Sequence, residues 1–325
     1  MTPGWNWDFE DSQKAASPPP GADRPPTPAP GGQGQAPSPQ RNVSYRRRRA
    51  GAGVVVLLAL AAILIVLASS GHRASAPPLQ ASGRVSHVRV RSRKDTIQAG
   101  EAAVANVFAY TPFVKQGSER ARDIALTFDD GPGPYTPALL SVLERLRVHA
   151  TFFVIGEELR YFSASTVREI EDGDVIGDHT ETHLALASLS AHDQHEELFE
   201  QILHIEALGG RRPTLFRPPY GSFNHTTIHE LHALHLLMVL WSVDTGDYQK
   251  PGVPVIIERV LAGAHPGAII LMHDAGGDRT QTIAALPTII HDLRARGYHL
   301  VTVPELLIDD PPPAGEPLPP SLAGD

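Results

Sequence analysis

The 325-residue sequence predicts an α/β protein whose folded body is an irregular (β/α) barrel of about seven parallel strands. From Asp123 to about Ile308, short apolar runs alternate with amphipathic helical patterns, which is typical of repeated β-then-α units. About seven such runs in roughly 185 residues are few for a regular eight-stranded barrel, so a compact or irregular barrel is favoured. A disordered tail and one transmembrane helix are expected before this body.

The first 49 residues are expected to form a disordered, Pro-rich tail. Up to residue 40 they are dominated by Pro, Gly, Ser, Ala and Gln, as in Ser17-Pro18-Pro19-Pro20. Such a composition offers too little apolar surface to offset the conformational entropy lost on folding. The Pro-x-x-Pro spacing is also compatible with a polyproline ligand, although a plain solvated tail is favoured.

Residues 50–70 are predicted to be a transmembrane signal anchor. Four arginines, Arg46 to Arg49, precede an uncharged apolar run from Ala50 to about Ala68. About 19 residues of helix come close to the roughly 30 Å of a bilayer's hydrocarbon core. The arginines predict a single-pass protein of the cell membrane, with a cytoplasmic N-terminus and an extracytoplasmic folded body. A signal peptide cut near Ala74-Ser75-Ala76 is the alternative, but the preceding arm is far too long for one.

Residues 71–120 are expected to be a stalk or linker that separates the membrane from the body at 121–308. Alternation over Val85–Arg91 indicates one strand, and 102–110 indicates a short helix. The last part of this segment, Tyr110 to Phe113, is the part that could contact the body. Residues 309–325, rich in proline, are expected to form a second disordered tail.

Charge and cysteine content exclude several classes of function. The chain has no cysteine, so disulfides and thiolate metal sites are excluded. Its formal charge of −8 is uneven, because residues 72–325 contain 21 basic and 32 acidic residues and carry −11. Nucleic-acid affinity comes mainly from phosphate contacts, so this acidic body argues against a nucleic-acid partner. No protein partner is inferred.

The body contains seven expected strands and six expected helices. The strands are Ile124–Phe128, Thr151–Ile155, Val175–Gly177, Leu215–Arg217, Leu236–Val243, Ala268–Met272 and His299–Val303. The helices are Thr136–Arg147, Ser165–Asp172, His192–Leu208, His225–His235, Val253–Ala262 and Thr282–Arg296.

Polar clusters follow the expected strands, where α/β folds place their chemistry. Asp129 and Asp130 come first, ahead of a Gly-Pro-Gly turn. Because neighbouring side chains point different ways in an extended or turning backbone, one carboxylate could bind a metal while the other moves a proton. A solvated Asp-Asp-Gly turn is the alternative interpretation.

Two histidines four residues apart, His179 and His183, follow the third expected strand. Imidazole is the commonest zinc ligand, and a helical turn would bring the two rings to one face. The acid does not directly follow the first histidine, so this is not the His-Glu-x-x-His pattern of metalloproteases. With Asp130, the pair would offer two nitrogens and one oxygen to a divalent metal and leave a position open for water.

The later strands are followed by further reactive side chains. Arg217, whose guanidinium is a two-pronged partner for a buried carboxylate, precedes two prolines that could direct the Tyr220 N–H at a ligand. Trp241, the only tryptophan of the body, precedes an Asp-Thr-Gly-Asp-Tyr segment at 244–248. His273 follows the sixth strand, where a general acid would be useful.

In order along the chain, five segments resemble the motifs of the polysaccharide deacetylases, the NodB-homology or carbohydrate esterase family 4 enzymes. The resemblance covers about residues 120–305 and implies an irregular barrel with a divalent metal, usually zinc, at the carboxyl ends of the strands. The segments are Thr127-Phe128-Asp129-Asp130-Gly131-Pro132, His179-x-x-x-His183, Arg217-Pro218-Pro219-Tyr220-Gly221, Asp244-x-x-Asp247-Tyr248 and Leu271-x-His273-Asp274.

The resemblance also implies a role for each matching residue. Asp130, His179 and His183 match the metal ligands, and Asp129 matches the general base with Arg217 as its partner. Tyr220 matches the residue whose backbone N–H helps to hold the oxyanion.

On the acid side, His273 matches the general acid, and Asp247 matches the carboxylate that orients it and favours its protonated form. Leu271 resembles the residue that lines the pocket for the acetyl methyl group. Tyr248 stands where the motif often has Trp, which could alter a pocket wall or a sugar contact. Trp241 is a further candidate for substrate binding.

These assignments imply a hydrolase that removes N-acetyl groups from a polysaccharide containing N-acetylglucosamine. A tethered enzyme facing outward meets the cell envelope, so peptidoglycan is the expected substrate. An O-deacetylase of acetylated xylan and a chitin-oligomer deacetylase are the alternatives within the class. A catalytically silent carbohydrate-binding protein is the rival outside it, but such a protein would be expected to lack a metal ligand, the base or the acid.

Overall fold

The computed structural model describes residues 92–320. The tail at 1–49, the apolar run at 50–70 and the strand expected at Val85–Arg91 therefore lie outside the described residues. Among the residues that are described, no helix is both long enough and apolar enough to span a bilayer.

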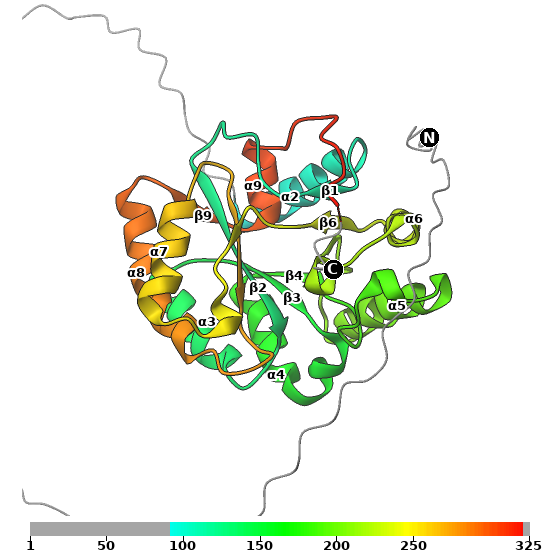
Figure 1. Cartoon of the computed structure of the whole chain (residues 1–325), viewed down its shortest axis with the longest axis horizontal. Helices are drawn as coiled ribbons and strands as arrows, with labels where there is room; N and C mark the ends of the chain where they lie inside the picture. Colours follow the sequence, from blue (N-terminus) through cyan, green and yellow to red (C-terminus); the bar gives the residue numbers. More distant parts are fainter. Residues whose placement is uncertain (1–91, 321–325) are drawn as a thin grey trace, which may run out of the picture. The chain divides into compact units, whose positions relative to one another are not determined.

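A curled sheet of parallel strands lies at the centre of the described region (Figure 1). The described residues contribute nine strands, in the order β1-β6-β5-β4-β3-β2-β8-β7, with β9 paired to β2 beside this path. Their bounds are β1 Phe113–Val114, β2 Asp123–Gly131, β3 Thr151–Val154, β4 Val175–Asp178, β5 Leu215–Phe216, β6 Leu237–Val239, β7 Val243–Asp244, β8 Ile269–His273 and β9 His299–Val301.

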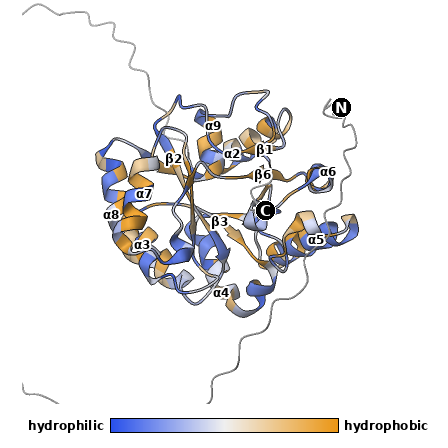
Figure 2. Cartoon of the chain, viewed as in Figure 1, coloured by the Kyte–Doolittle hydropathy of each residue, from blue (hydrophilic) through white to orange (hydrophobic). Residues whose placement is uncertain are grey.

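Helices surround this sheet on its outer side (Figure 1). In Figure 2 the central strands are largely hydrophobic, whereas the helices carry both hydrophobic and hydrophilic residues, as expected for helices that cover a core. Their bounds are α2 Arg93–Phe108, α3 Thr136–Leu146, α4 Gly156–Asp172, α5 Ala191–Ala207, α6 His225–Leu234, α7 Val253–Gly263, α8 Thr280–Ala295 and α9 Val303–Asp309.

The strand β2 pairs with three other strands and is buried along almost its whole length. On one side it pairs with β8, which sets Asp129 opposite His273. On the other side it pairs first with β9 and then, from Thr127 onward, with β3. Because all these strands are parallel, their carboxyl ends meet at one edge of the sheet and bring their terminal polar residues together.

The apolar run expected as one strand at Leu236–Val243 forms two strands, β6 and β7. The Leu240 N–H still bonds to Val114 on the β1 side, whereas the Ser242 N–H bonds to Ile269 at the start of β8. The chain thus crosses from one edge of the sheet to the other within three residues. This crossing curls the sheet and agrees with the expected irregular barrel.

Three apolar clusters fill the space between sheet and helices. The largest contains the stacked rings of Phe128 and Phe152, 5.3 Å apart, and side chains of α3, α7 and α8. The second joins the sheet to α2 and α9, and the third joins it to α5 and α6. Burial of this kind stabilises by about 25 cal/mol per Å² of apolar surface, so the clusters hold the strand ends in place.

The structure differs from the expected stalk in its second half. The helix α2 begins at a capping box formed by Ser92 and Asp95 and packs along α9, and β1 pairs with β6. The contact is apolar, because Val107 of α2 and Leu306 of α9 are buried in the same cluster. Residues 93–114 therefore belong to the folded body, and the helix expected at 102–110 starts at Arg93.

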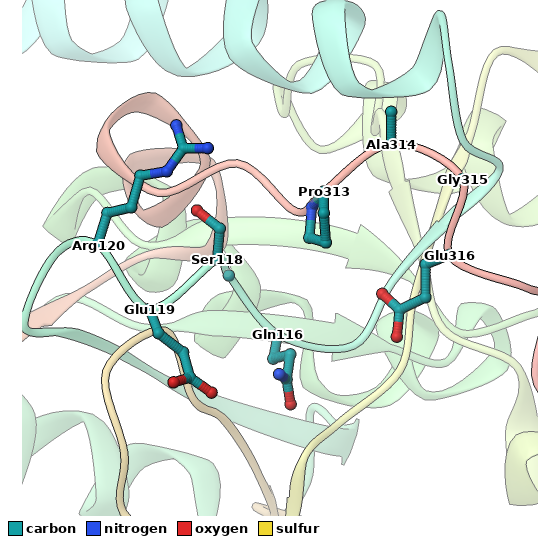
Figure 3. Close-up of a pocket in the computed structure, with 9 residues that line it drawn as sticks. Gln116, Ser118, Glu119, Arg120, Pro313, Ala314, Gly315 and Glu316 are labelled. Carbon is teal, nitrogen blue, oxygen red and sulfur yellow. The ribbon is translucent and has the colours of Figure 1, made fainter.

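Part of the tail expected to be disordered from residue 309 packs against the body, since α9 extends to Asp309 and Asp310 is buried. The Asp310 carboxylate is fully buried and accepts hydrogen bonds from the Ser118 N–H and hydroxyl and the Arg120 N–H at 2.6–3.0 Å. A pocket of about 580 Å³ lies between the segments 116–120 and 313–316 (Figure 3). The tail is held by polar contacts that its composition does not reveal.

Candidate active site

The two neighbouring aspartates at the end of β2 are presented in different directions. The pairing of β2 with β3 is irregular between Asp129 and Gly131, and Asp130 has a left-handed backbone with φ of 71°. This bulge turns Asp130 away from the direction of Asp129, as an extra residue in a strand does. Asp129 is 3% exposed, and its Oδ1 accepts a hydrogen bond of 2.7 Å from the buried Arg217.

Asp130, His179 and His183 come together as a candidate metal site. The Asp130 Oδ1 lies 3.1 Å from the His183 Nε2 and 3.5 Å from the His179 Nε2, and one ligand atom from each residue lies within 4.8 Å of the others. Burial would raise the pKa of Asp130, but the two histidines and the charge of His273 hold it well below its usual range. Two imidazole nitrogens and a carboxylate oxygen fit Zn²⁺ or another divalent metal.

In both histidines the Nδ1 atom contacts an oxygen of another residue, and the Nε2 atom faces Asp130. The His179 Nδ1 lies 2.7 Å from the Arg217 carbonyl oxygen, which can only accept. The His183 Nδ1 lies 3.1 Å from the Tyr220 hydroxyl. Such contacts fix the tautomer and ring orientation of metal-binding histidines.

Arg217 is fully buried and makes fixed contacts on several sides. Its guanidinium donates to Asp129 and to the Thr127 hydroxyl, both at 2.7 Å, and to the carbonyls of Val239 and Leu240. Burial lowers the pKa of Arg217, and the neighbouring Asp129 opposes that shift. A guanidinium with this many fixed partners both orients Asp129 and balances its charge.

The half-buried Trp241 lies beside this group. Its ring centroid is 5.7 Å from the Arg217 guanidinium, and its side chain packs against the apolar cluster that contains Phe216. These contacts place Trp241 beside Arg217 and against the core.

His273 and Asp247 form a second buried pair. The His273 Nδ1 lies 2.7 Å from the Asp247 Oδ1, and the Asp247 Oδ2 accepts from the His273 N–H and the Thr282 hydroxyl. Burial alone would lower the pKa of His273, but the hydrogen bond and charge of Asp247, with the charges of Asp130 and Asp129, raise it to about 9. His273 is therefore protonated at neutral pH.

The remaining predicted residues lie around these groups. Leu271 is buried in β8 two residues before His273, so both side chains point to the same face of the sheet. Tyr248 is 45% exposed, and its ring contacts His273 edge-on at 5.3 Å. Tyr220 is 60% exposed and has a left-handed backbone with φ of 59° in the short 3-10 turn Pro219–Gly221. The two exposed tyrosines thus flank the site, one beside a candidate ligand and one beside His273.

Two residues of this region, Thr127 and Asp274, are not candidates from sequence alone. Thr127 bridges Arg217 to the carbonyl of Ile270 on the neighbouring strand. Asp274 is fully buried and accepts a hydrogen bond from Thr136, and burial raises its pKa to about 7. Both stand inside the quoted motifs, but a sequence alone does not indicate which partner a motif residue contacts.

Taken together, the site can support a hydrolysis that needs a proton acceptor and a proton donor. Asp129 and His273 are opposite each other on paired strands, and the candidate metal ligands lie beside them. A carboxylate held by an arginine suits a general base, and a protonated histidine suits a general acid.

The sequence matches the profile of the family described as polysaccharide deacetylase over residues 116–239. The chain is 38% identical over 187 residues to a peptidoglycan-N-acetylglucosamine deacetylase of Bacillus cereus, a match covering 57% of this chain and 87% of that protein. It is 38% identical over 184 residues to the enzyme of the same description from Listeria monocytogenes, covering 56% of this chain but 38% of the relative.

Solved structures lead to the same group of proteins. The chain superposes with a TM-score of 0.59 and 33% identity on a crystal structure of a peptidoglycan N-acetylglucosamine deacetylase bound to a substituted N-oxidanyl-benzamide. The match covers 62% of this chain and 94% of that one.

Proposed function

Because the chain belongs to the polysaccharide deacetylase family, we propose that it removes N-acetyl groups from N-acetylglucosamine units of peptidoglycan with the help of a divalent metal. It is a polysaccharide N-deacetylase, a hydrolase that acts on the carbon–nitrogen bond of a linear amide. The observation that carries the proposal is the grouping of Asp130, His179 and His183 beside Asp129 and His273.

The donor set supports a metal at this site. Asp130, His179 and His183 would hold it through one oxygen and two nitrogens, and we propose Zn²⁺ as the ion. When bound, such an ion acidifies a water molecule and polarises a carbonyl group.

The side chains around it would supply the proton transfers. Asp129, oriented by Arg217, would accept a proton from the attacking water. The backbone N–H of Tyr220 would stabilise the negative charge that develops on the acetyl oxygen, a kind of contribution worth roughly 3–4 kcal/mol when it is lost. His273, held protonated by Asp247, would donate a proton to the departing amine.

Protonation of the leaving group supports an amide substrate. An amine leaves poorly from an acetamide unless it is protonated, and the pKa of His273 of about 9 keeps a proton available at neutral pH. An ester leaves more easily, so the same site could also release O-acetyl groups from acetylated xylan. Leu271 would line the pocket for the acetyl methyl group, and Tyr248 and Trp241 would contribute to sugar binding.

We place the enzyme at the cell membrane. The apolar run at 50–70, preceded by four arginines, would anchor the chain with its N-terminus in the cytoplasm. The deacetylase body would then face the cell envelope, where peptidoglycan is an accessible N-acetylated polymer. The first helix of the body that the structure describes, α2, begins at Arg93.

Acetate release by the full chain in detergent, with added Zn²⁺, tests the substrate. We expect release from peptidoglycan to exceed release from chitin oligomers and from acetylxylan at equal acetyl concentration. An Asp129→Asn variant, which keeps the size of the side chain, serves as the inactive control. Activity on acetylxylan alone would refute the N-deacetylase proposal, and activity on chitin oligomers alone would refute the choice of peptidoglycan.

A further inference from the structure

The loop that carries the two histidines of the candidate metal site has a strained backbone. Thr180 has a φ of 69° and His183 a φ of 59°, although neither is glycine. A left-handed backbone is unfavourable for residues with a branched or bulky side chain and persists only where the surroundings enforce it. Within the loop, the Asp178 carboxylate accepts from the Thr180 N–H and the Thr180 hydroxyl accepts from the His183 N–H, and contacts from the helices add to these.

The helix α5 supplies one set of restraining contacts through Glu197. Its carboxylate accepts from the Thr182 N–H at 2.8 Å and from the Thr182 hydroxyl at 2.6 Å. Its carbonyl oxygen accepts from the Glu181 N–H at 2.8 Å. A single residue of α5 thus holds two consecutive residues of the loop.

Glu181 supplies the second set of contacts, because its buried carboxylate ties the loop to two helices. One oxygen accepts from Arg160 of α4 at 2.6 Å, and the other lies 2.8 Å from the His204 Nδ1 of α5. The first residue of α4, Gly156, leaves room for this carboxylate. A Cβ at that position would lie 1.8 Å from the Glu181 Oε2.

We propose that Glu181 and Glu197 are positioning residues that hold the loop at 179–183 in its strained form and so preorganise His179 and His183 for the metal. Neither glutamate belongs to the group of candidate ligands. The inference rests on the metal-dependent function proposed above and extends it to two glutamates for which the motifs imply no role. Without these contacts the loop would relax, and metal binding would have to restore the strained form.

Zinc affinity of the metal-free full chain, measured by competition with a chromophoric chelator, tests this inference. We expect Glu197→Ala to weaken zinc binding by about 10- to 100-fold, the range typical of supporting contacts around metal ligands. Glu197→Gln keeps one acceptor oxygen and should recover part of that loss. Glu200→Ala, which removes an exposed glutamate from the same helix, is the matched control and should bind zinc as the wild type does.

Gly156→Ala is an independent variant, because it removes no polar group and acts by displacing the Glu181 carboxylate. Gly156→Ala should also weaken zinc binding. If Glu197→Ala does not fold, Gly156→Ala and Glu197→Gln together test the inference. A merely structural role would lower the unfolding temperature of the metal-free protein and leave the zinc Kd unchanged.

Wild-type zinc affinity in folded Glu197→Ala and Gly156→Ala would overturn the inference. If the wild type binds zinc and releases acetate while these variants bind zinc equally well, the positioning role alone fails. If the wild type neither binds zinc nor releases acetate, the proposed function fails together with it.

Discussion

Replacing Asp247 with Asn should move the basic limb of the pH–rate profile to lower pH. The Asp247 carboxylate is fully buried and makes a 2.7 Å contact with the His273 Nδ1. Asn is nearly the same size and keeps an oxygen that can accept from the His273 N–H or from Thr282. The change therefore removes the negative charge with little disturbance of packing.

The size of the expected rate loss follows from the pKa of His273, which is about 9 against an ordinary value of 6.5. The difference of about 2.5 pH units corresponds to roughly 3 kcal/mol, and the hydrogen bond and charge of Asp247 are its largest favourable causes. At pH 8 a group with a pKa of 9 is about 90% protonated, and one with a pKa of 6.5 about 3%. The variant should thus lose roughly 30-fold in rate at pH 8 and much less at pH 6.

The direction in which the basic limb moves follows from the role of His273 as a proton donor. Since the folded pKa is raised, the protonated donor is present below about pH 9 and is lost as the pH rises through that value. The negative charges of Asp130 and Asp129 also raise the pKa of His273, and a metal cation at Asp130 would offset part of them. Wild type and variant are therefore compared with the same metal bound. In the variant the protonated donor is lost at a pH about 2.5 units lower.

Acetate release measured from pH 5 to 10 gives the profile. Asp244→Asn, which neutralises an exposed aspartate of the same segment, is the control and should leave the basic limb in place. A basic limb at the same pH in wild type and Asp247→Asn would refute the assignment of His273 as the proton donor.

Three further substitutions test separate parts of the structure. Tyr220→Phe removes the hydroxyl beside His183 and should weaken zinc binding by about 10-fold in a chelator competition, whereas an unchanged Kd would mean that this contact does not orient the ring. Arg217→Met leaves Asp129 buried without its partner and should lower the free energy of unfolding in urea by about 3–5 kcal/mol; a loss below 1 kcal/mol would contradict the buried pair. Asp310→Ala leaves the Ser118 and Arg120 N–H groups without their acceptor and should cost about 2 kcal/mol in the same assay, and a neutral result would show that the tail adds no stability.

The alternation of strands and helices could be predicted from the sequence because it reflects burial. The strand expected at Ile124–Phe128 is the core of β2, and most helices begin or end within a few residues of their expected bounds. The helix α4 is an exception, since it starts at Gly156 and was expected from Ser165. Its backbone is kinked at Phe162, with φ of −126°, and the expected helix covers only the part after this kink.

The segments before and after the body could not be assigned because their partners are distant in sequence. The helix α2 buries Val104 and Val107 in one cluster with Leu306 of α9, about 200 positions away. Asp310 looks like part of a Pro-rich tail, and only the structure shows it bound to Ser118. Propensity and periodicity describe local preference and carry no information on such pairings.

The candidate site followed from the motifs, but its geometry did not. Residue types and spacing indicated Asp130, His179 and His183 as ligands. The bulge that separates Asp129 from Asp130 depends on strand register, and the contacts of Glu197 depend on how α5 is placed against the loop. Neither is encoded in the spacing of a motif.

The measurement that tests the central claim most directly is acetate release from peptidoglycan by the full chain after removal of metal. The stripped wild type should release no acetate, and stoichiometric Zn²⁺ should restore release. A His179→Ala variant treated in the same way should stay inactive after zinc is added. Full turnover in the presence of a strong chelator, or equal turnover of His179→Ala and wild type, would contradict metal-dependent deacetylation at this site.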